Sequence, residues 1–166
     1  MARYENKSLF YPTKLITLIK PLFLTIAIFI TTFLHAQQPL SAKQQEIQQA
    51  VVNMFQALAD RDSVALKSFC SPDISLYEYG QVWNIDTLIR KAITQHEAAD
   101  FKRTNSFQFL TTEADKNQAW VTYRLSSVIT RDAKETNIQW LETVILERQN
   151  KEWKVKHLHS TVIKRT

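Results

Sequence analysis

The fold class follows from residues 101–164, which read FKRTNSFQFLTTEADKNQAWVTYRLSSVITRDAKETNIQWLETVILERQNKEWKVKHLHSTVIK. Apolar side chains recur there at every second position, as they do in β-strands, where successive side chains point to opposite faces. Three short polar stretches interrupt the alternation and are typical of tight turns, at residues 115–117, 132–134 and 149–151. We therefore expect four long antiparallel strands, over residues 101–113, 118–131, 136–149 and 152–164.

The segment before these strands has the periodicity of a helix. Ser41 is followed three residues later by Gln44, which is the pattern of a capping box at a helix start. Apolar residues then recur at a helical spacing, at Ile47, Val51, Met54, Phe55 and Leu58. The pattern predicts an amphipathic helix with one buried side.

Two shorter helices and a hairpin are predicted between this helix and the long strands. Asp62 is placed to cap a second helix, and Asn84 or Asp86 to cap a third. Between them an aromatic, alternating segment turns at Gly80, the only glycine in the chain. Helices packed on one side of a curved sheet make this an α+β arrangement.

Several segments resemble the nuclear transport factor 2-like superfamily, in particular its SnoaL-like and ketosteroid-isomerase-like members. The likeness is carried by the end of the first helix, the Pro-Asp-Ile entry to a strand, the Tyr-Gly turn and the last strand, at residues 55–62, 72–74, 79–80 and 152–160. The resemblance implies a cone-shaped, curved antiparallel sheet packed on three N-terminal helices, the cystatin-like roll. It also implies an apolar cavity at the wide end of the cone. The superfamily hosts isomerases, cyclases, dehydratases and non-catalytic binding or dimerisation modules.

Residues 1–36 are predicted to be a signal peptide, which leaves residues 37–166 as a SnoaL-like domain. A basic segment precedes 14 largely apolar residues at 21–34, too few for the roughly 20 that span a bilayer, and Ala36 offers a small residue for cleavage. The alternative is an uncleaved membrane anchor. We expect export to the periplasm or the medium and no membrane association after cleavage.

Removing residues 1–36 takes away four basic and one acidic residue, which lowers the net charge from +5 to +2. A chain with so little net positive charge has no dense basic stripe for nucleic acid. Cys70 is the only cysteine, so no internal disulfide and no cysteine-based zinc cluster is expected. No cofactor is expected either.

Residues that line the cavity are predicted from strand phase. In the last strand Lys154 and Lys156 share one side and should face water, which places His157 and His159 on the opposite, inward side. Aromatic residues of the other elements complete the expected wall. The predicted ligand pocket comprises Tyr77, Tyr79, Trp83, Phe107, Tyr123, Trp153, His157 and His159.

Acid–base chemistry in this pocket has four candidate residues: His157, His159, Glu142 and Asp73. A histidine titrates near neutral pH and gains from a carboxylate partner. For chemistry of the ketosteroid isomerase kind, the possible donors are Tyr77, Tyr79 and Tyr123, and the possible proton acceptors are Asp73, Glu78 and Asp86. No spacing in the sequence singles one of them out. A metal site is not expected, because two histidines need a third ligand and no spacing brings one to them.

The segment 136–149 carries apolar residues on both sides, and helices cover only one of them. The outer face of the sheet is therefore expected to meet a second copy in a homodimer; the alternative is a long strand with Trp140 partly exposed. The favoured function is binding of a small apolar molecule. The alternatives are an isomerase, dehydratase or cyclase that uses a pocket histidine or carboxylate, and a dimerising association module.

Overall fold

The structure is a computed structural model that describes residues 39–95 and 98–166. The chain from Leu40 to Thr166 forms one compact unit. The predicted signal peptide, residues 1–36, lies outside the described residues. Within the described ranges, no helix is both long enough and apolar enough to cross a bilayer.

The helices begin where the capping residues predict. Ser41 and Gln44 form the capping box of helix α2, and Asp62 and Asn84 cap α3 and α4 with their side chains. Helix α4 continues directly into one turn of π-helix, η1. The bounds are Ala42–Ala59 for α2, Ser63–Ser68 for α3, Ile85–Ile89 for α4 and Arg90–Thr94 for η1.

Six strands form one sheet in the order β2-β1-β6-β5-β4-β3. Their bounds are Cys70–Glu78 (β1), Gln81–Trp83 (β2), Lys102–Ala114 (β3), Gln118–Arg131 (β4), Lys134–Gln149 (β5) and Glu152–Arg165 (β6). All neighbours are antiparallel except β1 and β6, which run parallel. The sheet is therefore mixed and not wholly antiparallel, because β1 joins β6 through the whole intervening chain and not through a hairpin. The α+β class with a curved sheet is confirmed.

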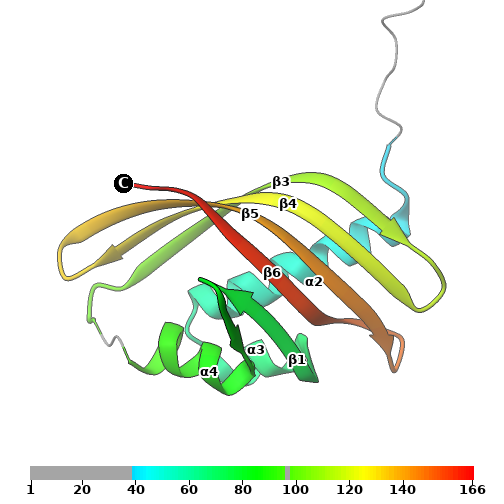
Figure 1. Cartoon of the computed structure of the whole chain (residues 1–166), viewed down its shortest axis with the longest axis horizontal. Coiled ribbons are helices and arrows are strands. Elements are labelled where there is room, and N and C mark those ends of the chain that lie inside the picture. Colours follow the sequence, from blue (N-terminus) through cyan, green and yellow to red (C-terminus); the bar gives the residue numbers. More distant parts are fainter. Residues whose placement is uncertain (1–38, 96–97) are drawn as a thin grey trace, which may run out of the picture. The chain divides into compact units, whose positions relative to one another are not determined.

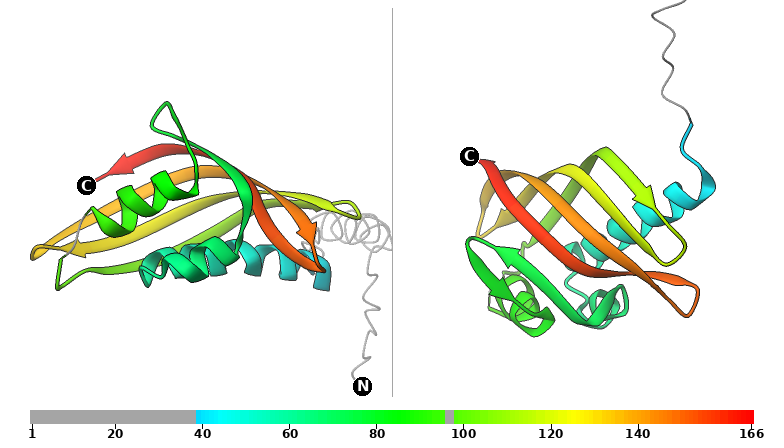
Figure 2. Two further views of the ribbon diagram at one scale, coloured as in Figure 1. Left: turned by 90° about the horizontal axis from the view of Figure 1, so that it is seen from below. Right: turned by 45° about the vertical axis from the view of Figure 1, so that its right-hand side comes forward.

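The three helices lie on one side of the curved sheet (Figures 1 and 2). Helix α2 contacts β3 and β6, whereas α3 and α4 contact β1. The apolar stripe of α2 and the inward side chains of β4, β5 and β6 form a single buried core. The core residues fully removed from solvent include Ile47, Val51, Leu66, Val121, Val144, Leu146 and Val155.

Strand β6 carries a β-bulge that reverses its phase. Leu146 of β5 pairs with Val155, but the neighbouring Ile145 pairs with His157, so Lys156 is an extra residue. Before the bulge, the side chain of Val155 points into the core. After the bulge, Leu158 points into the core instead of His157, and the side chain of His157 lies on the outer face of the sheet. A one-residue slip moves every later side chain to the other face. The prediction that His157 and His159 face inward is therefore wrong.

Strand β5 presents Ile138, Trp140, Glu142, Val144 and Leu146 to the core. Of the two apolar sides of β5, the side that contains these five residues therefore faces inward. Trp140 is buried, contrary to the alternative in which it is partly exposed. The exposed tryptophan of the sheet is instead Trp120, on β4.

Candidate functional site

A cavity of about 630 Å³ opens between helix α2, the α4–η1 segment and the inner face of the sheet. Its wall is largely apolar, as expected where helix and sheet faces turn toward each other. The apolar lining includes Met54, Leu76, Leu88, Ile138, Trp140 and Leu158. Three carboxylic side chains reach the same cavity, from Glu78, Asp132 and Glu142, and Asp132 is the exposed one.

Glu142 is the most deeply placed ionisable residue of this wall, with only 3% of its surface exposed. Ser160, its direct partner on β6, donates a hydrogen bond from Oγ to Glu142 Oε1 at 2.8 Å. Tyr123 stands opposite Glu142 on β4, and its hydroxyl is near the carboxyl although no hydrogen bond of regular geometry joins the two. Among the described residues, Glu142 Oε2 likewise has no regular hydrogen-bond donor.

Burial raises the pKa of Glu142 from 4.5 to about 7, because the ionised form loses its hydration. The Ser160 hydrogen bond, the Tyr123 hydroxyl and the charge of Arg103 act in the opposite direction and limit the rise. A carboxyl group with this pKa exists in both protonation states near neutral pH.

Glu78 lies on β1 next to this group. Burial, and after it the negative charge of Glu142, raise the pKa of Glu78 to about 7 as well. Ser160 and Arg103 both favour its ionised form. Because each charge disfavours the other, the two carboxyls titrate as a coupled pair.

Arg103, on β3, supplies the positive charge nearest to this pair. Its Nε donates to Asn105 Oδ1 at 2.9 Å and its Nη2 donates to Ser127 Oγ at 3.2 Å. The guanidinium also lies over the rings of Phe55 and Trp140, at 5.8 and 5.6 Å from their centroids. Arg103 is therefore held by its neighbours on both sides rather than by a direct ion pair with a described carboxylate.

The arrangement suits proton transfer inside an apolar cavity. Glu142 offers a carboxyl oxygen with no regular hydrogen bond and a pKa near neutrality, and Arg103 is placed to stabilise its anion. A base or acid of this kind is most effective when its pKa lies near the working pH.

The predicted pocket residues divide into those that line the cavity and those that do not. Tyr79, Trp83 and the catalytic candidate Glu142 line the cavity. The others do not: Phe107 and Tyr123 pack with Phe55 in an aromatic cluster, Trp153 is buried near Val155 outside the cavity wall, and Tyr77, His157 and His159 lie on the outer face. Phe107, Tyr123 and Trp153 do turn toward the core but lie away from the cavity, whereas the bulge in β6 turns His157 and His159 outward.

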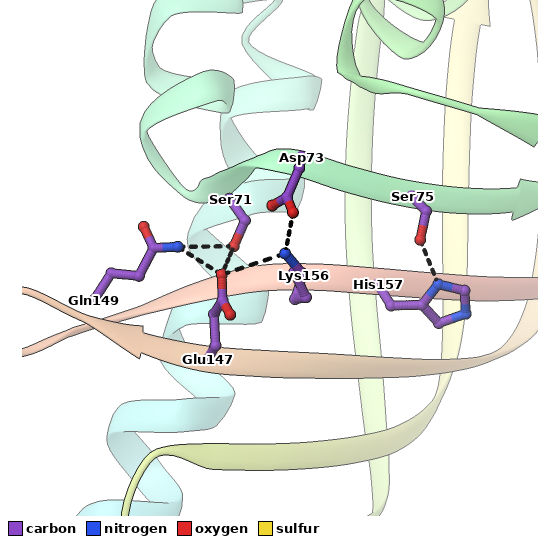
Figure 3. Close-up of polar contacts among 7 residues, drawn as sticks. All are labelled: Ser71, Asp73, Ser75, Glu147, Gln149, Lys156 and His157. Carbon is purple, nitrogen blue, oxygen red and sulfur yellow. Dashed lines mark hydrogen bonds and ion pairs between the residues drawn. The ribbon is translucent and has the colours of Figure 1, made fainter.

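His157 and Asp73 belong to the outer face of β1 and β6 (Figure 3), and His159, which is exposed, lies on the same face of β6. Ser75 Oγ and His157 Nδ1 are 2.8 Å apart, and the Tyr77 ring packs edge-on against the imidazole at 4.7 Å. Asp73 pairs with Lys156, the extra residue of the bulge. Acid–base chemistry inside the cavity by His157, His159 or Asp73 is thus contradicted by their positions.

Sequence reasoning missed Arg103 and the proximity of Glu78 to Glu142. The signal for Arg103 was present: it shares the alternation of Phe107 and Phe109, which turn toward the core, while Lys102 and Thr104 alternate with it. No pattern in the sequence links Glu78 to Glu142, because β1 and β5 are separated in the sheet by β6.

No group of three or more potential metal ligands among His, Cys, Asp and Glu occurs in the part of the chain that the structure describes. Cys70 is buried, and burial raises the pKa of its thiol to about 12. A thiol of this kind is not a nucleophile at neutral pH.

Comparison with solved structures shows the same fold in proteins of distant sequence. A ketosteroid isomerase-like protein from Erwinia carotovora atroseptica aligns with a TM-score of 0.61 and 14% identity, over 75% of this chain and 99% of that one. The hub homology domain of CamKII from Chlamydamonas reinhardtii aligns with a TM-score of 0.62 and 17% identity, over 74% and 100%. A candidate dehydratase of the NTF2-like family from Streptomyces avermitilis aligns with a TM-score of 0.63 and 14% identity, over 74% and 96%.

No curated protein sequence matches the chain significantly. The family model of the SnoaL-like domain, however, matches residues 47–164, which include every strand and most of helix α2. The curved sheet, the helices on one side and the cavity between them agree with this match. The chain therefore belongs to the SnoaL-like domain family, and it shares its fold with NTF2-like proteins.

Proposed function

We propose that this protein binds a small, largely apolar molecule in the cavity between helix α2 and the curved sheet. The proposal rests mainly on the cavity, because its volume of about 630 Å³ suits a ligand of about drug size. The apolar part of its wall supplies affinity, and the charged groups that reach it supply orientation. Burial of apolar surface is the main favourable term in such binding.

Fluorescence titration with 1-pyrenebutanol, a neutral apolar probe, tests this proposal. Ala92 lines the cavity from η1, so Ala92→Trp fills part of it, whereas Val64 is exposed on α3 and Val64→Trp adds the same bulk elsewhere. We expect the first variant to weaken probe binding at least about tenfold and the second to leave it unchanged. Equal binding by all three proteins would show that the probe binds elsewhere. Native mass spectrometry of the purified protein then identifies any molecule that accompanies it.

A second candidate function is proton-transfer catalysis of the isomerase or dehydratase kind, and Glu142 favours it. Its carboxyl group faces the cavity, has a pKa of about 7 and leaves Oε2 without a regular hydrogen bond among the described residues. In such a reaction the carboxylate removes a proton from a carbon next to a carbonyl group and returns it to the same or another position.

Exchange of the α-protons of 2-tetralone in D₂O, followed by NMR, tests this second function. Glu142→Gln removes the base and should slow exchange about 100-fold or more. Glu135→Gln removes an exposed carboxylate of the same strand and should have no effect. Absence of exchange in the unmodified protein, or equal exchange in both variants, refutes a role of Glu142 as base for such ketones.

We also propose that the outer face of the sheet mediates self-association as a homodimer. Trp120, Ile145 and His157 form one row across β4, β5 and β6, and Trp120 and Ile145 are 49% and 41% exposed. Exposed apolar patches of this kind mark association surfaces. A CamKII hub homology domain has the same fold, and an association role is the corresponding alternative to ligand binding.

Analytical ultracentrifugation distinguishes these possibilities. Trp120→Glu should convert a dimer to a monomer, whereas Val64→Glu on α3 should not. A strictly monomeric unmodified protein at high concentration removes the association role.

We further propose that residues 1–36 direct export and are removed near Ala36. The supporting feature is the basic segment followed by the apolar run at 21–34. Expression in a bacterial host followed by N-terminal sequencing of the periplasmic fraction tests this. A chain that keeps its first 36 residues and stays with the membrane would contradict cleavage.

A further inference from the structure

The cavity wall is richer in positive than in negative side chains. Three carboxylates reach it, from Glu78, Asp132 and Glu142. Five cations reach it, from Lys91, Arg103, Arg131, Lys134 and Arg165. A cavity that only holds an apolar molecule has no need of so many charges, because bringing a cation toward an apolar region costs free energy.

Most of these cations lie where the cavity opens. Arg131 and Lys134 are directly paired at the start of the β4–β5 hairpin, and Arg165 is near the end of β6 opposite Ile138. Lys91 reaches the same cavity from η1. Glu142, in contrast, lies eight residues further along β5 than Lys134. The mouth therefore carries four cations and one carboxylate, Asp132 of the β4–β5 turn, whereas Glu142 lies in the interior.

The cations of the mouth have no carboxylate partner within 4 Å among residues 39–95 and 98–166; the ion pairs found there involve Lys67, Lys154 and Lys156 instead. Three of them lie against aromatic rings: Lys91 is 5.1 Å from the Trp83 centroid, Arg131 is 5.8 Å from that of Phe101, and Arg165 is 6.0 Å from that of Tyr79.

Two of these cations, Arg165 and Arg131, have features that favour the binding of an anion. Arg165 Nη2 also donates to the Tyr79 hydroxyl at 2.9 Å, which fixes the guanidinium. Arg131 Nε is buried without a hydrogen-bond acceptor among the described residues. Guanidinium groups that are held in place but lack an anion are suited to bind a carboxylate.

We propose that the natural ligand is an organic acid, with an apolar body in the cavity and a carboxylate at the mouth against Arg131, Lys134 and Arg165. This inference rests on the proposed binding function and specifies its ligand class. The body contacts the apolar wall, which includes Trp140 and Leu158. The carboxylate adds negative charge to a mouth in which four cations outnumber one carboxylate, Asp132.

Paired probes test the inference: 1-pyrenebutyrate and 1-pyrenebutanol share the aromatic body and differ in the carboxylate. The unmodified protein should bind the butyrate about tenfold more tightly at low ionic strength, and the preference should fall as salt is added. The double variant Arg131→Gln/Lys134→Gln should lose about tenfold in butyrate affinity and little in butanol affinity. Lys116→Gln/Lys151→Gln removes two exposed cations from turns at the other end of the sheet and should keep the preference.

The outcomes separate the two proposals. Equal affinity of the unmodified protein for both probes overturns the ligand class and leaves cavity binding intact. Failure to bind either probe contradicts cavity binding and, with it, the ligand class. A preference that survives in Arg131→Gln/Lys134→Gln also overturns the inference. If that variant does not fold, Lys134→Gln, at an exposed position, must lower the preference about threefold, and Arg131→Lys/Lys134→Arg must retain it.

Discussion

Replacing Glu142 with glutamine is expected to stabilise the protein at alkaline pH and to change its stability little in acid. The buried carboxyl has its pKa raised from 4.5 to about 7, so between these values the folded state keeps a proton that the unfolded state has lost. Raising the pH therefore favours unfolding, by at most about 1.4 kcal/mol per pH unit. A rise of about 2.5 units in pKa corresponds to about 3 kcal/mol once the pH exceeds 7. Glutamine keeps an oxygen for Ser160 and has no proton to lose.

Urea unfolding of the unmodified protein and of Glu142→Gln at pH 5, 6, 7 and 8 measures this difference. The free energies of unfolding should be close at pH 5 and should diverge by up to about 3 kcal/mol at pH 8, with the variant more stable. Loss of the Glu142 charge also lowers the pKa of Glu78, which adds in the same direction. Glu135→Gln on the same strand is the matched control and should follow the unmodified protein. Parallel stability curves for the unmodified protein and Glu142→Gln would refute a buried, proton-holding carboxyl at this position.

Three further outcomes are expected. Leu146→Ala empties a fully buried position of β5 and should lower the free energy of unfolding by about 2–5 kcal/mol, measured by urea denaturation; a loss below about 1 kcal/mol would contradict its place in the core. Asp62→Ala removes the side-chain acceptor of the Val64 and Ala65 amides at the start of α3 and should cost about 1 kcal/mol, and Asp62→Asn should restore most of this. Tyr123→Phe removes a hydroxyl that favours the ionised carboxyl and should raise the pKa of Glu142, measured by ¹³C NMR titration of the glutamate carboxyls; a lowered value would argue against this contact.

Local patterns predicted the elements of the fold well. The capping box at Ser41 and Gln44 and the cap at Asp62 fix helix starts through neighbouring atoms, so the sequence alone identifies them. The turn at Tyr79 and Gly80 is equally local, because both residues have positive φ as a two-residue hairpin turn requires. The four long strands begin and end close to the predicted turns for the same reason.

The site was less predictable because its geometry depends on contacts between distant segments. The bulge that turns His157 outward is held by the pairing of Lys156 with Asp73 and Glu147, which lie on two other strands. Simple alternation in β6 therefore predicts the wrong side beyond Val155. The sequence identifies Glu142 as a candidate. Its position beside Glu78, however, depends on the parallel pairing of β1 with β6, and no local pattern in the sequence predicts that pairing.

The central place of β6 has a consequence for how the chain assembles. β6 is the sixth strand in order of synthesis, yet it lies between β1 and β5. Until residues 152–165 emerge from the ribosome, both neighbours expose unpaired edges, and such edges invite aggregation or chaperone binding. Pairing of β1 with β6 is slow, because bringing together segments so far apart in the sequence costs conformational entropy. The sheet of the nascent chain therefore stays open until β6 is available, and the cavity, which Leu158 and Arg165 of β6 help to line, is completed only then.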